Sequence, residues 1–378
     1  MKQTVLITGG AGFIGSRLAN TLIAGGYQVR VLDNLSPQIH GVEPQTSSLL
    51  HSLHHSVEFI RGSVTSREDL IKALDGVDTV VHLAAETGTG QSMYAIQHYS
   101  DVNIGGTSLL LDLIANKPFP VKKLIVASSR AVYGEGKYHC DHHGFVFPAA
   151  RSDKNMAHGD FSVHCPVCDG AIELMATDED TPVRPSSLYG ITKLTQEQMV
   201  LTVGKALGIS AIAFRYQNVY GPGQSLSNPY TGILSIFSTR IRNKSPINIF
   251  EDGKESRDFV FIDDVVAITA QAVEYEKQLV DVFNVGSGVA TSVSFIADAI
   301  QRMLGETVPT TISGQYRLGD IRHNVADISK VMERFGFKPS VYIEEGLNRF
   351  VDWVKSETVQ VDRYEQSLVE LRAKGLFK

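Results

Sequence analysis

The chain has 378 residues, 43% of them hydrophobic and 20% charged, a composition typical of a globular protein with a large core. Its formal net charge of −6, with no stripe of Lys and Arg, argues against nucleic acid or an anionic membrane surface as a partner. No apolar run approaches the ~20 residues of a membrane span, so we expect a cytoplasmic protein. The chain has three cysteines, and this small, odd number argues against a framework of disulfide bonds.

The first apolar run, residues 5–7, leads into a glycine-rich turn and then into a helical pattern over residues 17–23. The turn carries Gly9, Gly12 and Gly15. Glycine is needed where backbone N–H groups approach a pyrophosphate and where a helix packs too closely on a strand for a Cβ atom. The anion then lies at the helix N-terminus, where unpaired N–H groups and the helix dipole favour negative charge. The pattern predicts a dinucleotide-binding turn; its alternative is an ordinary strand-to-helix connection.

A second predicted strand, residues 28–33, ends in a carboxylate. Asp33 stands where dinucleotide-binding proteins carry the acid that hydrogen-bonds the adenosine ribose. Its charge would repel a 2′-phosphate, so we expect NAD rather than NADP. The alternative is a solvated turn residue in front of Asn34.

Strands and helices then alternate along the chain. Apolar strands are predicted over residues 57–60, 79–85 and 123–127, with helical patterns over residues 70–74 and 103–114 between them. Because parallel strands need a helical crossover between them, this alternation predicts an α/β fold with a doubly wound parallel sheet.

Short motifs follow one another in a fixed order along roughly nine-tenths of the chain. They are His82-Leu83-Ala84-Ala85, Asn103 with Gly106-Thr107, Ser128-Ser129 before Val132-Tyr133-Gly134, Tyr189-Gly190-Ile191-Thr192-Lys193, Arg215 with Asn218 to Gly223, Arg257-Asp258-Phe259, Asn284-Val285-Gly286, and Arg317 with Gly319-Asp320. In these motifs the sequence resembles the extended short-chain dehydrogenases/reductases of the nucleotide-sugar epimerase and dehydratase group. One departure is Ser63, where the family usually has an Asp near the adenine.

The resemblance implies a bound NAD cofactor and a nucleotide-sugar substrate. The residues that it assigns to the cofactor are Gly9, Gly12, Phe13, Ile14, Gly15, Asp33, Asn34, Ser63, Val64, Leu83, Ala84, Ala85, Asn103, Tyr189 and Lys193. The residues that it assigns to the substrate are Thr87, Gly88, Thr89, Asn218, Arg257, Arg317 and Asp320. The two arginines are the expected phosphate partners, since a guanidinium grips phosphate oxygens bidentately.

The same resemblance implies how the chain divides. We expect a Rossmann NAD-binding domain over residues 1–220, to which residues 259–285 return. A smaller substrate lobe is expected from residues 221–258 and 286–355, followed by a tail over residues 356–378. Members of the family commonly form homodimers through two helices, which here correspond to the segments 103–115 and 188–207.

Three side chains can carry the chemistry. Tyr189 and Lys193 are four residues apart in a helical pattern, so both lie on one face. An ammonium group near a phenol would lower the pKa of the phenol and make Tyr189 a general base. Ser129, at the end of a neighbouring strand, could donate to the same substrate oxygen. In the family these three residues remove a proton from a sugar hydroxyl while the carbon beneath it passes hydride to the nicotinamide.

The residues after Ser129 select among the reactions of the family. Its 4,6-dehydratases carry Asp and Glu there, whereas this chain has Arg130 and Ala131, which cannot serve as the acid and base of water elimination. The 3,5-epimerase branch of the family uses a cysteine, and no cysteine lies near this strand, which counts against 3,5-epimerisation. We therefore expect an NAD-dependent 4-epimerase that works through a transient 4-keto sugar. A UDP-hexose or UDP-uronate 4-epimerase, a 4,6-dehydratase and, from another class, a non-catalytic NAD-binding sensor remain open.

All three cysteines lie in a segment, residues 136–177, that the family does not usually carry. Cys140 with His143 forms one knuckle, and Cys165 with Cys168 forms the other. Three thiolates and one imidazole complete a tetrahedral shell, which suits a structural zinc ion. The alternatives are His142 as the fourth ligand and a loop with three idle cysteines.

The insertion also narrows the resemblance. Together with the glycine-rich stretch over residues 87–94, it is similar to the dTDP-L-rhamnose 4-epimerase branch of the family. That branch implies dTDP-L-rhamnose or a related nucleotide-activated hexose as the substrate. The stretch follows a predicted strand at its carboxyl end, where such sheets bind sugars, so it is expected to contact the hexose.

Overall fold

A seven-stranded sheet lies at the centre of the computed structural model, which describes residues 3–230 and 232–378. Its strand order is β13-β9-β5-β4-β1-β2-β3, and each neighbouring pair is parallel. The strands are β1 (Thr4–Thr8), β2 (Gln28–Asp33), β3 (Glu58–Arg61), β4 (Thr79–His82), β5 (Lys123–Ser129), β9 (Ser210–Tyr216) and β13 (Val280–Val285). The predicted doubly wound α/β fold is confirmed.

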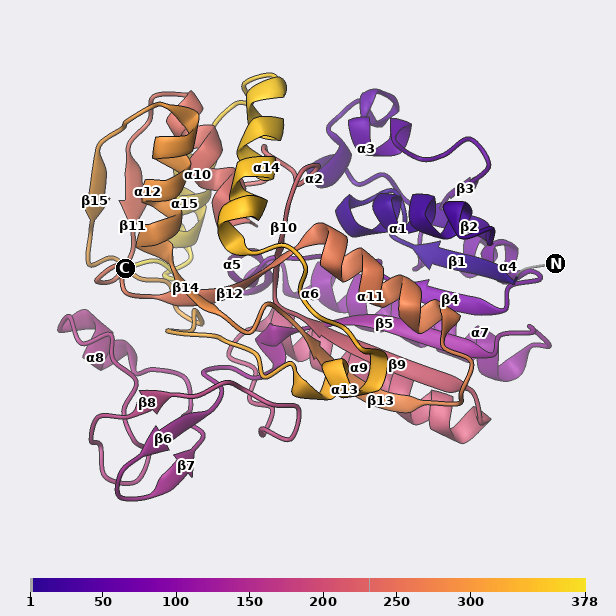
Figure 1. Ribbon diagram of the computed structural model, residues 1–378, viewed down its shortest axis with the longest axis horizontal. Helices are drawn as coiled ribbons and strands as arrows, with labels where there is room; N and C mark the ends of the chain where they lie inside the picture. Colours follow the sequence, from indigo (N-terminus) through magenta and orange to yellow (C-terminus); the bar gives the residue numbers. More distant parts are fainter. Residues whose placement is uncertain (1–2, 231) are drawn as a thin grey trace.

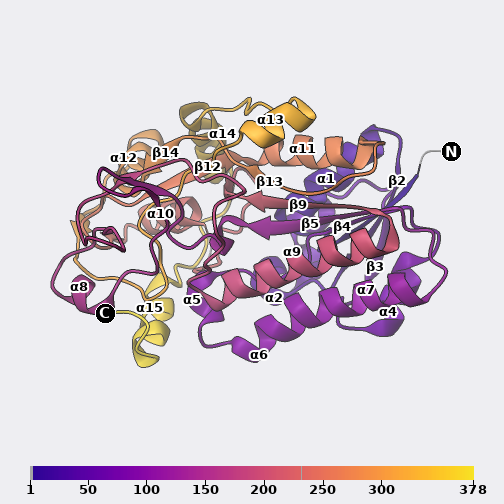
Figure 2. The same cartoon turned by 90° about the horizontal axis from the view of Figure 1, so that it is seen from below.

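Helices cover both faces of this sheet (Figure 1, Figure 2). One face carries α4 (Arg67–Leu74), α7 (Gly106–Asn116) and α9 (Leu188–Leu207); the other carries α1 (Phe13–Ala24), α11 (Ile262–Glu274) and α13 (Ser329–Phe335). The buried residues of β5 alternate between the two cores: Ile125 packs on the side of α1, and Leu124 and Val126 pack on the side of α7. A strand covered on both faces is apolar at every position, which explains the continuous apolar runs of the sequence.

The strand order reverses between β1 and β4. From β1 the chain proceeds through β2 to β3 at one edge, and from β4 it proceeds through β5 and β9 to β13 at the other. In open parallel sheets the connections diverge at such a point and leave a crevice at the carboxyl ends of the two strands. The fold therefore places a binding crevice directly after the glycine-rich turn.

A second, smaller lobe lies beyond these strand ends (Figure 1). Its sheets are formed by β10 (Asn218–Tyr220), β12 (Ser256–Phe261) and β14 (Ala290–Ser292), and by β11 (Ile247–Ile249) with β15 (Thr310–Ile312). Its helices are α10 (Ile233–Arg242), α12 (Val293–Leu304), α14 (Ile343–Ser356) and α15 (Tyr364–Ala373). Between these elements in the sequence, α11 and β13 pack with the large sheet.

The segment with the cysteines forms a small body at one end of the molecule (Figure 1). It contains the antiparallel strands β6 (Tyr138–Cys140), β7 (Gly144–Val146) and β8 (Glu173–Leu174), and the short helix α8 (Asp153–Ala157). Its own core holds the buried residues Tyr138, Cys140, Val146, Val163 and Cys165. A second small cluster, Met156 and Phe161 with Tyr316, packs the segment against the smaller lobe.

Short helical turns complete the chain: α2 (Pro37–His40), η1 (Pro44–Thr46), α3 (Ser48–His51), α5 (Thr89–Ser92), α6 (Ile96–Tyr99), η2 (Ser100–Gly105) and η3 (Arg130–Val132). Among the described residues we find no helix whose length and apolar character would let it span a bilayer.

Candidate active site

One cavity of about 560 Å³ lies between the carboxyl ends of the central strands and the smaller lobe. Every residue predicted to bind the cofactor or the substrate, or to act in catalysis, lines this cavity, with Asn103 as the single exception. Residues from positions 9 to 320 of the sequence thus meet in one place.

The glycine turn fits a pyrophosphate group. A Cβ atom on Gly15 would lie 2.5 Å from the carbonyl oxygen of Gly9, and one on Gly9, whose φ is +68°, would lie 2.8 Å from the backbone nitrogen of Ala84. Gly12 is the N-cap of α1 and offers no side chain to cap the helix. The first N–H groups of α1 therefore face the cavity with no capping side chain and no acidic residue in the first turn, an arrangement that suits an anion.

Asp33 is held at the rim of the same cavity. Its Oδ2 accepts a hydrogen bond from the backbone nitrogen of Ala11 at 3.0 Å, and its Oδ1 accepts one from Leu35 at 2.8 Å. The carboxylate thus links β2 to the glycine turn in a fixed orientation. Each oxygen keeps a lone pair for a ribose hydroxyl, so these residues fit the adenosine half of NAD.

Asn103 lies beneath the cavity and connects two elements of its wall. Its Oδ1 accepts a hydrogen bond from the backbone nitrogen of Glu86 at 2.7 Å, and its Nδ2 donates to Thr192 Oγ1 at 2.9 Å. The fully buried amide therefore holds the loop after β4 against α9. A direct contact between Asn103 and the cofactor stays a prediction.

A buried chain of hydrogen bonds reaches Lys193 from the centre of the sheet. His82 lies between Thr8, with Nδ1 to Oγ1 at 2.7 Å, and Thr107, with Nε2 to Oγ1 at 2.9 Å. Gln196 Nε2 donates to the same Thr107 oxygen at 2.8 Å, and its Oε1 accepts from Lys193 Nζ at 2.9 Å. Burial lowers the pKa of Lys193 to about 7, and burial together with the charge of Lys193 lowers that of His82 to about 3. His82 is therefore neutral, and Lys193 exchanges its proton near physiological pH.

Tyr189 lies in the first turn of α9, where two serines fix the backbone. Ser187 Oγ caps the helix by accepting from Gly190 N at 3.1 Å, and Ser92 Oγ accepts from Tyr189 N at 3.0 Å. Burial raises the pKa of the Tyr189 phenol, while a hydrogen bond with Ser129 and the charge of Arg130 lower it; the net direction is upward. Ser129 and Arg130 therefore oppose the effect of burial on the pKa of Tyr189. The sequence spacing predicts Lys193 as the group that lowers this pKa.

Cationic side chains gather at the end of the cavity that faces the smaller lobe. The Nε and Nη2 atoms of Arg317 lie 2.9 and 2.8 Å from Asp320 Oδ2, and its guanidinium lies 5.1 Å from the centre of the Phe250 ring. Arg130 Nε donates to Asn218 Oδ1 at 2.6 Å. Burial and the charge of Arg257 lower the pKa of Arg130 to about 10, so the group remains a cation at neutral pH. This end of the cavity suits a diphosphate.

Comparison with known proteins identifies the family. Residues 5–146 and 166–286 match the model of the NAD dependent epimerase/dehydratase family. The chain belongs to this family. The match omits residues 147–165, which lie inside the predicted insertion, and the predicted family resemblance is confirmed.

Relatives within the epimerase/dehydratase family agree with the predicted reaction. A dTDP-L-rhamnose 4-epimerase of Burkholderia thailandensis is 37% identical over 361 residues, which cover 94% of this chain and 96% of that protein. A UDP-glucuronic acid 4-epimerase of Bacillus cereus, solved with UDP-glucuronic acid and NAD, superposes with a TM-score of 0.76 at 27% identity, covering 93% of this chain and 99% of that one. A UDP-glucose 4-epimerase of Thermotoga maritima, solved with UDP-glucose, gives a TM-score of 0.74 at 29% identity, with coverages of 93% and 99%.

The cavity of this family member also contains residues that the motifs did not indicate. Phe250, Glu251, Glu255 and Tyr364 all line it. Glu255 is 5% exposed, and its Oε2 has no hydrogen-bond partner among the described residues. Burial and the charge of Glu251 raise the pKa of Glu255 to about 7. In the sequence, only their position close to the Arg257 motif indicates that Glu251 and Glu255 belong to the site. Tyr364 lies in the C-terminal tail, which carries no motif.

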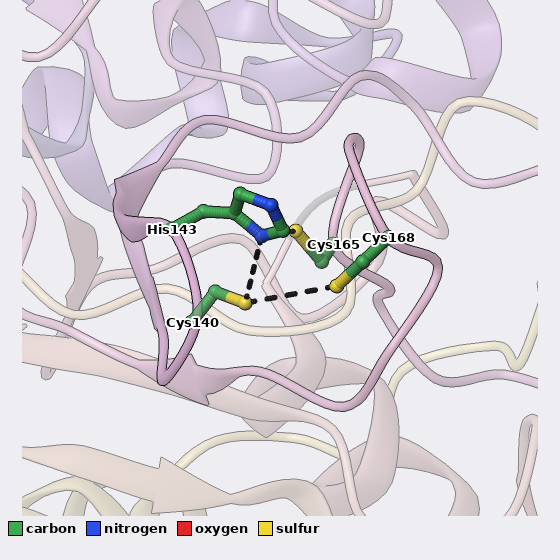
Figure 3. Close-up of side chains that lie close together, drawn as sticks. All are labelled: Cys140, His143, Cys165 and Cys168. Atoms are coloured by element: carbon green, nitrogen blue, oxygen red, sulfur yellow. Dashed lines mark hydrogen bonds between the residues drawn. The ribbon is translucent and has the colours of Figure 1, made fainter.

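The four predicted metal ligands lie together in the inserted segment (Figure 3). Their ligand atoms are all within 4.8 Å of one another: Cys140 Sγ is 3.4 Å from His143 Nδ1 and 3.8 Å from Cys168 Sγ, and Cys165 Sγ is 3.6 Å from His143 Nδ1. Zinc–sulfur bonds of about 2.3 Å in a tetrahedron separate the sulfur atoms by about 3.8 Å. The geometry fits a zinc ion, with His143 rather than His142 in the fourth position.

Proposed function

We propose that this chain is an NAD-dependent 4-epimerase of a nucleotide-activated sugar, with dTDP-L-rhamnose or a related hexose as the substrate. The observation that carries the proposal is the single cavity in which the glycine turn, the pair Ser129 and Tyr189, and the arginine cluster meet. NAD bound there would accept hydride from the sugar C4 and return it to the opposite face. The glycine turn and α1 would hold its pyrophosphate, and Asp33 its adenosine ribose.

Tyr189 moves the proton. Its phenolate takes the proton of the sugar 4-hydroxyl when hydride leaves and gives it back when hydride returns. Ser129 donates to the same oxygen and stabilises the phenolate through the hydrogen bond that lowers the pKa of Tyr189 against burial. Lys193, held by Gln196, places its amino group on the same face of α9 and adds a positive charge there in its protonated form.

The residues beside Ser129 keep the reaction at epimerisation. Arg130 donates to Asn218, and Ala131 has no group that could transfer a proton, so neither serves as an acid or a base for water elimination. The transient ketone is therefore reduced again by the returning hydride. The loop over residues 87–89 lines the cavity and would contact the hexose, while Arg257 and Arg317 would hold the diphosphate.

The proposal also includes a bound zinc ion, a cytoplasmic location and a homodimer. One zinc ion would be held by Cys140, His143, Cys165 and Cys168 as a structural element, in a cytoplasmic protein whose thiols remain reduced. A homodimer would form through α7 and α9, which pack side by side, with Ile191 exposed on α9.

A panel of dTDP- and UDP-sugars, followed by NMR with the NAD-loaded protein, tests the activity. We expect the C4 epimer of one sugar to accumulate without build-up of NADH. Tyr189→Phe is the matched control: it removes one oxygen, and we expect it to fold, to bind NAD and to lose at least about a hundredfold in kcat. Accumulation of a stable ketone would contradict the proposal, as would near-wild-type turnover in Tyr189→Phe.

A further inference from the structure

A guanidinium from the inserted segment is buried between the insertion and the smaller lobe. Arg151 lies in the stretch that the family model leaves unmatched, and 3% of its side chain is exposed. Its Nη1 and Nη2 donate to the two oxygens of Glu251 at 2.7 and 2.8 Å, and its Nε donates to Glu135 Oε1 at 3.1 Å. Both acids are as deeply buried as the arginine. The planar fork of the guanidinium matches a carboxylate in this way, which an ammonium group cannot reproduce.

Two carbonyl oxygens complete the surroundings of Arg151. Its Nη1 donates to the carbonyl of Phe161 in the insertion at 3.1 Å, and its Nη2 donates to the carbonyl of Asp320 at 3.0 Å. The single side chain therefore connects the insertion to the segment 320–322, whose first residue, Asp320, lines the cavity.

The segment 320–322 positions both of the predicted phosphate-binding arginines. The carboxylate of Asp320 holds Arg317 at 2.9 Å. The carbonyls of Ile321 and Arg322 accept from the two terminal nitrogens of Arg257 at 2.9 and 3.0 Å. A shift of this backbone segment would displace both guanidinium groups together.

Glu251 adds a second connection to the cavity. It lines the cavity, and its φ of +51° lies in the left-handed region, which is unfavourable for a residue other than glycine. Besides Arg151, it is held by Arg322 Nη1 at 2.9 Å. Strained backbone of this kind persists only where the surroundings fix it, and here part of the surroundings is supplied by the insertion.

We propose that Arg151 is a positioning residue for the nucleotide diphosphate: it fixes the segment 320–322 and Glu251, and so sets where Arg257 and Arg317 present their guanidinium groups. The inference rests on the proposed function, since it assigns the insertion to the substrate half of that site. A purely structural ion pair is the alternative. It would affect stability while leaving nucleotide affinity unchanged.

Arg151→Lys tests the proposal, because it keeps the buried charge and removes the fork. We expect the Kd for dTDP and UDP, measured by calorimetry with the NAD-loaded protein, to rise about tenfold. The KM of the sugar nucleotide should rise in parallel, while kcat changes less than about twofold. Lys154→Met, on the exposed side of α8, is the matched control and should bind as the wild type does. A folded Arg151→Lys protein with wild-type nucleotide affinity would overturn the proposal.

A second variant decides the question if Arg151→Lys does not fold. Glu135→Gln keeps both contacts of Arg151 with Glu251 and an oxygen that can accept from Arg322 N, as Glu135 Oε2 does at 2.8 Å. It removes a charge that orients the guanidinium, and we expect about a threefold weaker Kd for dTDP. An unchanged Kd would overturn the proposal in that case. The proposed function can fail separately. A wild-type protein that binds dTDP but epimerises no sugar contradicts the proposed activity. In that case the nucleotide affinities alone still decide the role of Arg151.

Discussion

At the scale of single residues, opposing effects act on the pKa of Tyr189, the proposed proton-transfer group. Burial raises its pKa, and Ser129 and Arg130 lower it. Ser129→Ala removes the hydrogen bond, so the pKa of Tyr189 should rise further. Since a base acts above its pKa, the rising limb of the kcat–pH profile should move to higher pH, with kcat at pH 7 reduced at least about tenfold. A profile that keeps its position would show that Ser129 does not act on the phenol.

Lys193 illustrates the cost of a buried charge. Burial lowers its pKa to about 7, whereas an unfolded lysine titrates near 10.4. The unfolded chain therefore binds more protons between these values, and the stability cost of the buried lysine is complete below pH 7 and declines as the pH rises toward 10. Lys193→Met should raise the unfolding free energy of the NAD-free protein by roughly 3 kcal/mol at pH 6 and by less at pH 9.

Thermal unfolding at the two pH values checks this expectation. The same variant should lose turnover, because the proposed site then lacks the amino group that shares a face of α9 with Tyr189. A stability change of equal size at pH 6 and pH 9, or a loss of stability at pH 6, would contradict the account of Lys193.

At the scale of elements, the glycine turn and α1 depend on close packing. A Cβ on Gly15 would lie 2.5 Å from backbone atoms of the turn, so Gly15→Ala must shift α1 away from the turn. We expect NAD to bind about tenfold more weakly, and the unfolding free energy to fall by about 1–3 kcal/mol. Gly105→Ala is the control, since its Cβ would meet nothing closer than 3.8 Å. Equal NAD affinity in the two variants, measured by calorimetry, would contradict the role of the turn.

We expect the inserted segment to depend on its cluster of predicted metal ligands. Its own buried core is small, so its fold needs a further source of stability, which we expect metal coordination to supply. Metal analysis should find one zinc ion per chain, and the double variant Cys165→Ser/Cys168→Ser should lose the zinc and lower the Tm. Because Arg151 belongs to this segment, the variant should also weaken dTDP binding more than NAD binding. A wild-type protein without metal would refute the zinc site.

At the scale of the whole molecule, features defined by neighbouring residues were predictable. The strand alternation determined the parallel sheet, and the spacing of Gly9, Gly12 and Gly15 depends only on one turn. The spacing of Tyr189 and Lys193 similarly follows from helix geometry. The cysteine knuckles could be read in the sequence because all their ligands fall within one segment.

Features made by distant parts of the chain were not predictable. Arg151 and Glu251 are 100 positions apart, and no periodicity connects them. Tyr364 reaches the cavity only because α15 packs back on the smaller lobe. Asn103 shows the converse: its motif is intact, yet its amide is used beneath the cavity to join Glu86 and Thr192. Burial, which sets the pKa values of Tyr189 and Lys193, is likewise a property of the complete fold.

The central claim is that hydride leaves C4 of the sugar and returns to the same carbon while Tyr189 holds the proton. It is tested most directly with dTDP-L-rhamnose deuterated at C4, incubated in ordinary water with the NAD-loaded enzyme. The account predicts a product inverted at C4 that retains its deuterium, as measured by NMR. An inverted product with hydrogen from solvent at C4 would contradict it.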